Sequence, residues 1–264
     1  MSYLKNLKIY SFLLIIILSS CSASDHTAPD SEQLVMSTLW FQRSAEMRAL
    51  YYQAFNIAEM RVDQALENYT GDKKPAVVVD IDETILDNSP SEALNILEGE
   101  RYSDERWMEW TSRAEAEPLP GSREFADYLV HKGVELIYIS NRKVEEMIPT
   151  IENLKKYGFP NADAGHIFLK SETSSKKERR EKVAEQYNII LLIGDNLGDF
   201  TELFDDRSDN MGKPAVDSLQ ERFGKDFIVL PNPIYGSWTS AMFRSSGLSP
   251  QEIAEKRKSY LIDY

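Results

Sequence analysis

The sequence predicts an α/β fold, in which helices flank a mostly parallel sheet and a smaller helical N-terminal or cap element is added. Three observations predict it. Five continuous apolar runs recur along the 264 residues, as in strands that are buried on both faces of a sheet. Segments with helical spacing separate these runs, which is the order of a parallel α/β domain. With 42% hydrophobic residues, the chain can also form a sizeable core.

The N-terminal segment, residues 1–20, looks like a bacterial lipoprotein signal peptide. Two lysines precede the apolar run from Ser11 to Leu18, and small residues follow before Cys21. This run is shorter than the roughly 20 apolar residues that span a bilayer. The resemblance implies that Cys21 is acylated, and the absence of Asp after it implies the bacterial outer membrane, on its periplasmic or outer side. An uncleaved anchor or a buried cysteine is the alternative.

Residues 21–33 are polar and rich in small side chains, so we expect a lipid-anchored tether there. Residues 34–264 are predicted to form the folded domain. From Leu34 to Tyr69, apolar and aromatic residues recur at roughly helical spacing, which predicts one long helix or two. The pattern indicates core packing and leaves open whether these helices form a homodimer.

Strands and helices alternate after this region. The predicted strands lie in residues 76–82, 134–140, 166–170, 188–195 and 227–231. Helical patterns cover residues 122–132, 144–158 and 176–187. In sheets of this kind, ligands bind beyond the carboxyl ends of the strands. The residues that end the apolar runs are therefore candidate site residues.

Four carboxylates lie at or just beyond the carboxyl ends of two of the predicted strands. Asp80 and Asp82 end the first run, and Asp195 and Asp199 follow the fourth. Because unpaired buried carboxylates cost several kcal/mol each, we expect a divalent cation to stabilise them. Mg²⁺ prefers oxygen ligands, usually one or two carboxylates with waters and substrate phosphate. The sequence therefore predicts one Mg²⁺ per subunit at this end of the sheet.

Four ordered motifs resemble those of the haloacid dehalogenase superfamily in its phosphatase form with four aspartates. They are DIDET from Asp80, SNR from Ser140, a downstream lysine, and GDNLGDF from Gly194. The longer pattern DIDETILDNSP, with WMEW and NPIYGSW further along, is similar to the class C nonspecific acid phosphatases, which are bacterial surface lipoproteins. The similarity runs from about Val35 to Trp238. It implies a Rossmannoid core and a magnesium-dependent acid phosphatase.

The resemblance implies a role for each aspartate. Asp80 would attack phosphorus and form an aspartyl-phosphate. Asp82 would protonate the leaving alkoxide and then deprotonate the water that hydrolyses the intermediate. The metal would take the carboxylates of Asp80 and Asp195 and the backbone carbonyl of Asp82. Asp199 would hold a metal-bound water without contacting the metal.

Cationic and polar side chains are expected to bind the phosphoryl group. Lys176 aligns best with the family lysine, while Lys170 and Lys177 are alternatives that would otherwise be surface charges. Ser140 and Asn141 are expected to donate hydrogen bonds to phosphoryl oxygens.

Two arginines accompany these motifs. The resemblance places Arg179 one helical turn after the lysine, as a support for the site. Arg142 either serves the site or only pairs with a nearby carboxylate, and the sequence leaves both open.

Aromatic residues are expected to select the substrate. The resemblance places an aromatic clamp at Trp107 and Tyr235, with Tyr102 as a third aromatic residue of the pocket, whereas Trp110 is expected in the core. Stacking tolerates any base, because every base has a π-face. Nucleoside monophosphates, 5′-nucleotides above all, and aryl phosphates are therefore the predicted substrates.

Charge and composition narrow the function further. The net charge of −13 argues against polymeric nucleic acid as a partner. The single cysteine excludes a disulfide framework and a thiolate metal cluster, and the three histidines argue against a metal site built from several histidines. A haloacid dehalogenase is one alternative function. Such an enzyme lacks the second acidic residue that this chain has at Asp82, so the DxD pattern argues against it. A phosphotransferase that uses the same intermediate and a catalytically inactive nucleotide-binding lipoprotein remain alternatives.

Overall fold

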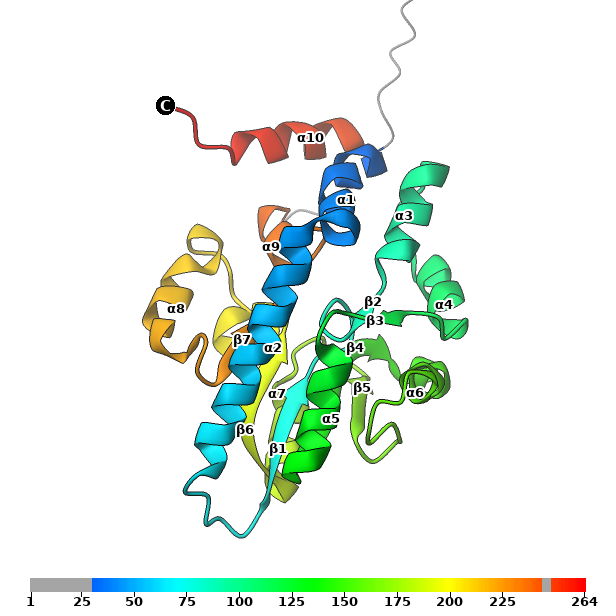
Figure 1. Cartoon of the computed structure of the whole chain (residues 1–264). Coiled ribbons are helices and arrows are strands. Elements are labelled where there is room, and N and C mark those ends of the chain that lie inside the picture. Colours follow the sequence, from blue (N-terminus) through cyan, green and yellow to red (C-terminus); the bar gives the residue numbers. More distant parts are fainter. Residues whose placement is uncertain (1–29, 244–247) are drawn as a thin grey trace, which may run out of the picture.

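The computed structural model describes residues 30–243 and 248–264 (Figure 1). The predicted signal peptide, Cys21 and most of the predicted tether lie outside this part of the chain. The 3-10 helix η1 (Asp30–Leu34) falls partly within the range 21–33, and its Ser31 is buried. Ordered packing therefore begins before residue 34. In the described ranges, no helix has both the length and the apolar character needed to cross a membrane.

The centre of the fold is a five-stranded sheet in which all neighbouring strands are parallel. Its strand order is β5-β4-β1-β6-β7. The strands are β1 (Lys74–Val79), β4 (Glu135–Lys143), β5 (Ile167–Lys170), β6 (Tyr187–Gly194) and β7 (Phe227–Val229). Each overlaps one of the apolar runs, so the predicted α/β fold with a parallel sheet is confirmed.

Helices cover both faces of the sheet. The long helix α2 and the helix α5 lie in front of it in Figure 1, and α7 lies behind it. The main flanking helices are α2 (Ala45–Leu66), α5 (Ser122–Lys132), α6 (Met147–Lys156) and α7 (Lys177–Gln186). The helix α1 (Val35–Arg43) precedes α2 and packs beyond the sheet (Figure 1). Alternate residues of β1 enter two cores: Val77 and Val79 pack with α2 and α5, while Ala76 and Val78 pack with Val183 of α7.

The N-terminal helical region consists of two helices. Ser44 has an extended backbone conformation, which ends α1, and its hydroxyl accepts a hydrogen bond from the Met47 amide at 3.1 Å, which caps α2. The buried face of α2 includes Tyr51, Phe55 and Val62. The expected core packing is therefore confirmed for Phe41, Tyr51 and Phe55, whereas Leu39, Leu50 and Tyr52 of the same apolar pattern are exposed, because the pattern covers more than the one face that each helix buries.

A small excursion follows β1 and rises above the carboxyl ends of the strands. It contains the antiparallel pair β2 (Leu86–Asp87) and β3 (Glu117–Pro118) and the helices α3 (Ser89–Glu98) and α4 (Asp104–Ser112). The C-terminal part adds α8 (Lys213–Ser218), α9 (Ser237–Met242) and α10 (Pro250–Ser259). Short 3-10 helices are η2 (Val144–Glu146), η3 (Leu197–Asp199), η4 (Glu202–Phe204), η5 (Asn210–Gly212) and η6 (Gln220–Arg222).

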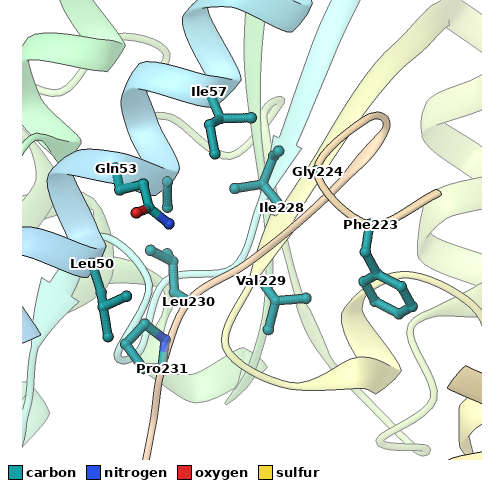
Figure 2. Close-up of a pocket in the computed structure, with 10 residues that line it drawn as sticks. Leu50, Gln53, Ile57, Phe223, Gly224, Ile228, Val229, Leu230 and Pro231 are labelled. Carbon is teal, nitrogen blue, oxygen red and sulfur yellow. The ribbon is translucent and has the colours of Figure 1, made fainter. Parts of the chain in front are cut away.

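An apolar groove of about 320 Å³ lies between α2 and the end of β7. Figure 2 shows Leu50 and Ile57 of α2 facing Ile228, Leu230 and Pro231 across it. Its lining includes none of the motif carboxylates. Gln53 is the one polar side chain of the lining and no cationic side chain contributes to it, so this groove is not the candidate site for a phosphate group.

Candidate active site

The carboxyl ends of β1 and β6 bring two motif aspartates together. Parallel pairing places Val79 opposite Ile193, and the Asp80 amide donates a hydrogen bond to the Ile193 carbonyl at 3.0 Å. Asp80 follows β1 directly and Asp195 follows β6 directly. The ligand oxygens of Asp80, Asp195 and Asp199 lie within 4.8 Å of one another. Three of the four aspartates thus converge as the sequence predicts.

Lys176 supplies positive charge to this cluster. It precedes α7, is 4% exposed, and its Nζ lies 2.5 Å from Asp80 Oδ1 and 2.7 Å from Asp199 Oδ1. Lys177 pairs instead with Glu202 at 3.1 Å, and Lys170 ends β5. The geometry therefore favours Lys176 over both alternatives.

The backbone around η3 holds Asp199 in place. The Asn196 amide donates a hydrogen bond to Asp199 Oδ2 at 2.9 Å. A Cβ at Gly194 would lie 2.1 Å from the same oxygen, so a larger residue there would displace the carboxylate. Arg180 donates hydrogen bonds to the carbonyls of Gly198 and Asp199 at 3.0 and 3.1 Å. The last aspartate of the GDNLGDF motif is therefore rigidly placed.

Burial changes the acidity of the cluster. It raises the pKa of Asp80 well above the ordinary value; Lys176 opposes this, and Asp199, Asp195 and Asp82 add to it. Burial and the neighbouring Asp199 raise the pKa of Asp195 to about 7, although the hydrogen bond from Asn232 opposes this. Burial alone would lower the pKa of Lys176, but Asp199 and Asp80 raise it. One ammonium group thus fails to compensate the three carboxylates.

This donor set fits a divalent cation. Carboxylate oxygens are the ligands that Mg²⁺ prefers, and the three oxygens lie close enough together to share one ion or its waters. Asp80 and Asp195 would be the ligands, as the family resemblance implies. A bound cation would offset the burial and the like-charge repulsion that raise the pKa of Asp80 and of Asp195.

Asp82 lies beside the cluster and binds other partners. Its Oδ1 accepts hydrogen bonds from Arg142 Nε and Nη2 at 2.9 and 2.8 Å and from Asn88 Nδ2 at 2.9 Å. Its Oδ2 accepts one from the Ser140 hydroxyl at 3.1 Å. Arg142 therefore pairs with a carboxylate, which was one of its two predicted roles. Ser140, expected to contact phosphate, donates to Asp82 in this structure.

Asn141, near the carboxyl end of β4, is hydrogen-bonded to Arg179 and not to Asp82. Arg179 Nη1 donates a hydrogen bond to the Ser140 carbonyl at 2.6 Å, and its Nη2 donates to Asn141 Oδ1 at 2.7 Å. None of the hydrogen bonds found among the described residues uses Asn141 Nδ2, and Asn141 is exposed. Its amide can therefore donate to a ligand, and its role toward phosphate stays a prediction, while Arg179 supports the strand end.

Known proteins share this architecture. A family model described as HAD superfamily, subfamily IIIB (Acid phosphatase) matches residues 22–238. The chain belongs to this family. The class C acid phosphatase from Bacillus anthracis is 40% identical and superposes with a TM-score of 0.85, over 90% of this chain and 100% of that chain. Its tungstate-bound structure gives 41% identity and a TM-score of 0.84, over 89% and 98% of the two chains.

Curated relatives of this acid phosphatase family member are more distant. The stem 31 kDa glycoprotein of Glycine max is 27% identical over 161 residues, which are 59% of this chain and 57% of that protein. Vegetative storage protein 1 of Arabidopsis thaliana is 28% identical over 166 residues, which are 60% and 54% of the two chains. The chain spans about half the length of the curated relatives it matches.

The predicted aromatic residues of this family member lie on two loops and a helix. Trp107 and Trp110 are on α4, and the Tyr102 and Trp107 rings are 6.4 Å apart. Tyr235 lies between β7 and α9, is 39% exposed, and its amide donates to Asn232 Oδ1 at 3.4 Å. Trp110 packs against the core, as expected, and also donates a hydrogen bond to Asn88 Oδ1 at 2.8 Å.

Three polar residues of the site were missed at the sequence level. Asn232 Nδ2 donates to Asp195 Oδ2 at 2.8 Å, and Thr84 Oγ1 donates to Asp195 Oδ1 at 3.3 Å. Asn88 donates to Asp82. Each lies inside a stretch that carries the family resemblance, DIDETILDNSP or NPIYGSW. Polar side chains within those stretches were the available signal, but their partners depend on loop geometry.

Proposed function

We propose that this protein is an acid phosphatase that hydrolyses phosphomonoesters with one Mg²⁺ per subunit. The observation that carries the proposal is the Asp80, Asp195, Asp199 and Lys176 cluster at the carboxyl ends of β1 and β6. The tungstate bound by the Bacillus anthracis relative supports it, because tungstate is a tetrahedral oxyanion like phosphate.

In the first half of the reaction, Asp80 attacks the phosphorus. The bond from phosphorus to the ester oxygen breaks, Asp82 gives its proton to that oxygen, and the alcohol leaves. Lys176, which lies 2.5 Å from Asp80, orients the nucleophile and binds a phosphoryl oxygen. Asn141 donates a hydrogen bond to a second oxygen.

In the second half, water hydrolyses the aspartyl-phosphate. Asp82 takes a proton from the water, the water oxygen bonds to phosphorus, and the Asp80 carboxylate is released with phosphate. Lys176 then again bridges Asp80 and Asp199, as it does in this structure. A divalent cation held by Asp80 and Asp195 would neutralise negative charge on the phosphoryl group.

The proposed substrates are nucleoside monophosphates, chiefly 5′-nucleotides, and aryl phosphates. Trp107, Tyr102 and Tyr235 are the aromatic residues expected to contact the base. Tyr102 and Tyr235 are 60% and 39% exposed, so both can offer a ring face to a ligand. Binding through ring faces favours aromatic esters over small aliphatic ones.

The proposal also includes a lipid anchor at Cys21 and a place in the bacterial outer membrane. Metabolic labelling with a palmitate analogue tests it, with Cys21→Ser as the control. Label on the wild type and none on the variant is the expected result, together with recovery in the outer-membrane fraction. Label that persists on the variant would contradict acylation at Cys21.

An assay of phosphate release tests the proposed activity. Purified wild type is assayed with 5′- and 3′-nucleotides, sugar phosphates and aryl phosphates, with Mg²⁺ or with a chelator, at acidic and neutral pH. Asp80→Asn keeps the shape of the side chain but removes the nucleophile, so turnover should be lost while the circular dichroism spectrum is unchanged. Substantial turnover by the variant would refute the assignment of Asp80.

Two alternatives give different outcomes in the same assay. A phosphotransferase would convert an added alcohol into a new phosphate ester in preference to releasing phosphate. A non-catalytic protein would bind nucleotide without turnover at any Mg²⁺ concentration. This alternative is considered because the Arabidopsis thaliana relative is named a storage protein. Product analysis with an added acceptor and equilibrium nucleotide binding separate both from hydrolysis.

A further inference from the structure

The two carboxylate oxygens of Asp82 have unequal surroundings. Oδ1 accepts three N–H donors, two from Arg142 and one from Asn88, at 2.8 to 2.9 Å. Oδ2 accepts a single hydrogen bond, from the Ser140 hydroxyl at 3.1 Å. A carboxylate oxygen has two lone-pair directions, so three donors saturate Oδ1. A proton on Asp82 therefore has room only on Oδ2.

We propose that Arg142 and Asn88 are positioning residues that occupy Asp82 Oδ1 and leave Oδ2 as the atom that gives and takes the proton. This inference rests on the proposed phosphatase function, in which Asp82 is the general acid and base. The Ser140 hydroxyl accepts a hydrogen bond from the Arg142 amide at 3.1 Å and so directs its own proton to Oδ2. It thus limits the rotation of the carboxyl group without occupying both lone pairs of that oxygen.

Arg142 is itself firmly held. Its side chain is fully buried, whereas that of Asp82 is 14% exposed. Its Nη1 donates to Thr150 Oγ1 at 3.2 Å, and its Nη2 also approaches Asn88 Oδ1 at 3.4 Å. A planar guanidinium fixed at both ends is a rigid support for one carboxylate oxygen.

The helix α4 contacts both positioning residues. Trp110 Nε1 donates to Asn88 Oδ1 at 2.8 Å, which orients the Asn88 amide so that its Nδ2 faces Asp82. The Trp107 ring lies 5.9 Å from the Arg142 guanidinium carbon. Trp110 therefore does more than fill the core. The helix that carries the proposed base-stacking residue also determines the position of the proton donor.

The dependence of rate on the leaving group tests the inference. Arg142→Lys keeps the positive charge but loses the planar pair of donors, and Trp110→Phe keeps the ring but loses the donor to Asn88. Each variant is compared with wild type through kcat/KM for phenyl, 4-nitrophenyl and 2,4-dinitrophenyl phosphate. These esters have similar shapes, but the basicity of the leaving group falls from phenyl to 2,4-dinitrophenyl phosphate. The need for a proton donor therefore decreases in the same order.

Arg142→Lys should lower kcat/KM for phenyl phosphate by about tenfold to a hundredfold, because general acid catalysis contributes about 10² to 10⁴. The loss for 2,4-dinitrophenyl phosphate should be less than about threefold, because its leaving group needs little protonation. Trp110→Phe should give the same pattern with a smaller amplitude, and Asp82→Asn the same pattern with a larger one. If Arg142→Lys does not fold, the leaving-group dependence of Trp110→Phe tests the positioning role instead.

Arg180→Lys is the matched control. Arg180 is also a buried arginine, but it donates to the carbonyls of Gly198 and Asp199 and not to Asp82. Its replacement should change kcat/KM by the same factor for every ester. Equal losses for all leaving groups in Arg142→Lys and Trp110→Phe, or no loss, would overturn the positioning role alone. Wild type that hydrolyses none of the esters would overturn the proposed function and this inference with it.

Discussion

Removing the divalent cation should make the folded protein less stable as the pH rises from about 5 to 8. Burial and the neighbouring Asp199 raise the pKa of Asp195 to about 7 from its ordinary value of 3.8. A carboxyl group whose pKa is raised by folding stabilises the folded state while it keeps its proton. That contribution is complete below pH 3.8 and is lost as the pH rises through about 7. The metal-free protein should therefore lose stability across this window.

The magnitude follows from the difference between the two pKa values. A tenfold change in an acid dissociation constant corresponds to about 1.4 kcal/mol, so Asp195 contributes at most about 4 kcal/mol in total, of which about 3 kcal/mol is lost between pH 5 and 8. The pKa of Asp80 is raised in the same direction, also through burial, and adds to the fall. Bound Mg²⁺ favours the ionised carboxylates, so it should increase stability at pH 8 more than at pH 5.

The assay is urea unfolding at several pH values, with chelator or with Mg²⁺. Asp195→Asn removes the titrating group and a proposed metal ligand but keeps the side-chain shape. In chelator at pH 8, this variant should be more stable than wild type, and it should gain less from Mg²⁺. Asp217→Asn, at an exposed position of α8, is the control and should behave as wild type does.

Three outcomes would contradict the reasoning. The free energy of unfolding of the chelated wild type could be flat or could rise between pH 5 and 8. Asp195→Asn could show the same pH dependence as wild type, which would place the titration on other groups. Finally, Mg²⁺ could stabilise wild type and Asp195→Asn equally, which would place the cation elsewhere.

Three further substitutions test the site and the fold. Lys176→Met should lower kcat/KM by at least about a hundredfold, since removing one donor to developing negative charge costs about that much; activity near that of wild type would contradict its role. Tyr235→Ala should raise KM for a nucleoside monophosphate by about fivefold or more, from a stacking energy of about 1 to 3 kcal/mol, and raise KM for a small aliphatic phosphate much less. Equal effects on both esters would mean that Tyr235 only packs. Ile137→Ala, at a fully buried position of β4, should lower the free energy of unfolding by about 2 to 5 kcal/mol in urea and leave kcat/KM unchanged; a loss of activity in folded protein would show that β4 packing reaches the site.

The sheet could be predicted well because the physics that forms it is local. A strand buried on both faces needs a continuous apolar run, and each of the five runs overlaps a strand of the structure. The helix predicted at residues 122–132 agrees with α5 (Ser122–Lys132) residue for residue. Gly121 and Gly133 bracket it in the left-handed conformation, where glycine ends helices readily. The pair β2 and β3 was missed, because two-residue strands have no periodicity.

The sequence predicted which residues lie at the strand ends that form the site. It did not predict which of these residues hydrogen-bond to one another. Parallel topology alone brings Asp80 and Asp195 together, since both follow neighbouring strands. Nothing in the SNR motif indicates that Ser140 and Arg142 would both bind Asp82. That arrangement depends on the path of β4 beyond its last regular pairing with β1, which is a property of the folded chain.

An acidic chain binds phosphate only if the local charge differs from the overall charge. At the candidate site, three carboxylates face one Lys176, so the fully ionised cluster has a net charge of −2 and repels a phosphate dianion. A divalent cation would bring this sum to zero, and Lys176 and Asn141, in their proposed roles, would then hold the phosphoryl group against little repulsion. For the proposed phosphatase we therefore expect cation binding and phosphate binding to strengthen each other, and by the same factor, because coupling between two sites is reciprocal. The remaining acids stay on the solvated surface and keep polyanions away, so the same net charge of −13 is consistent with small phosphate esters as substrates.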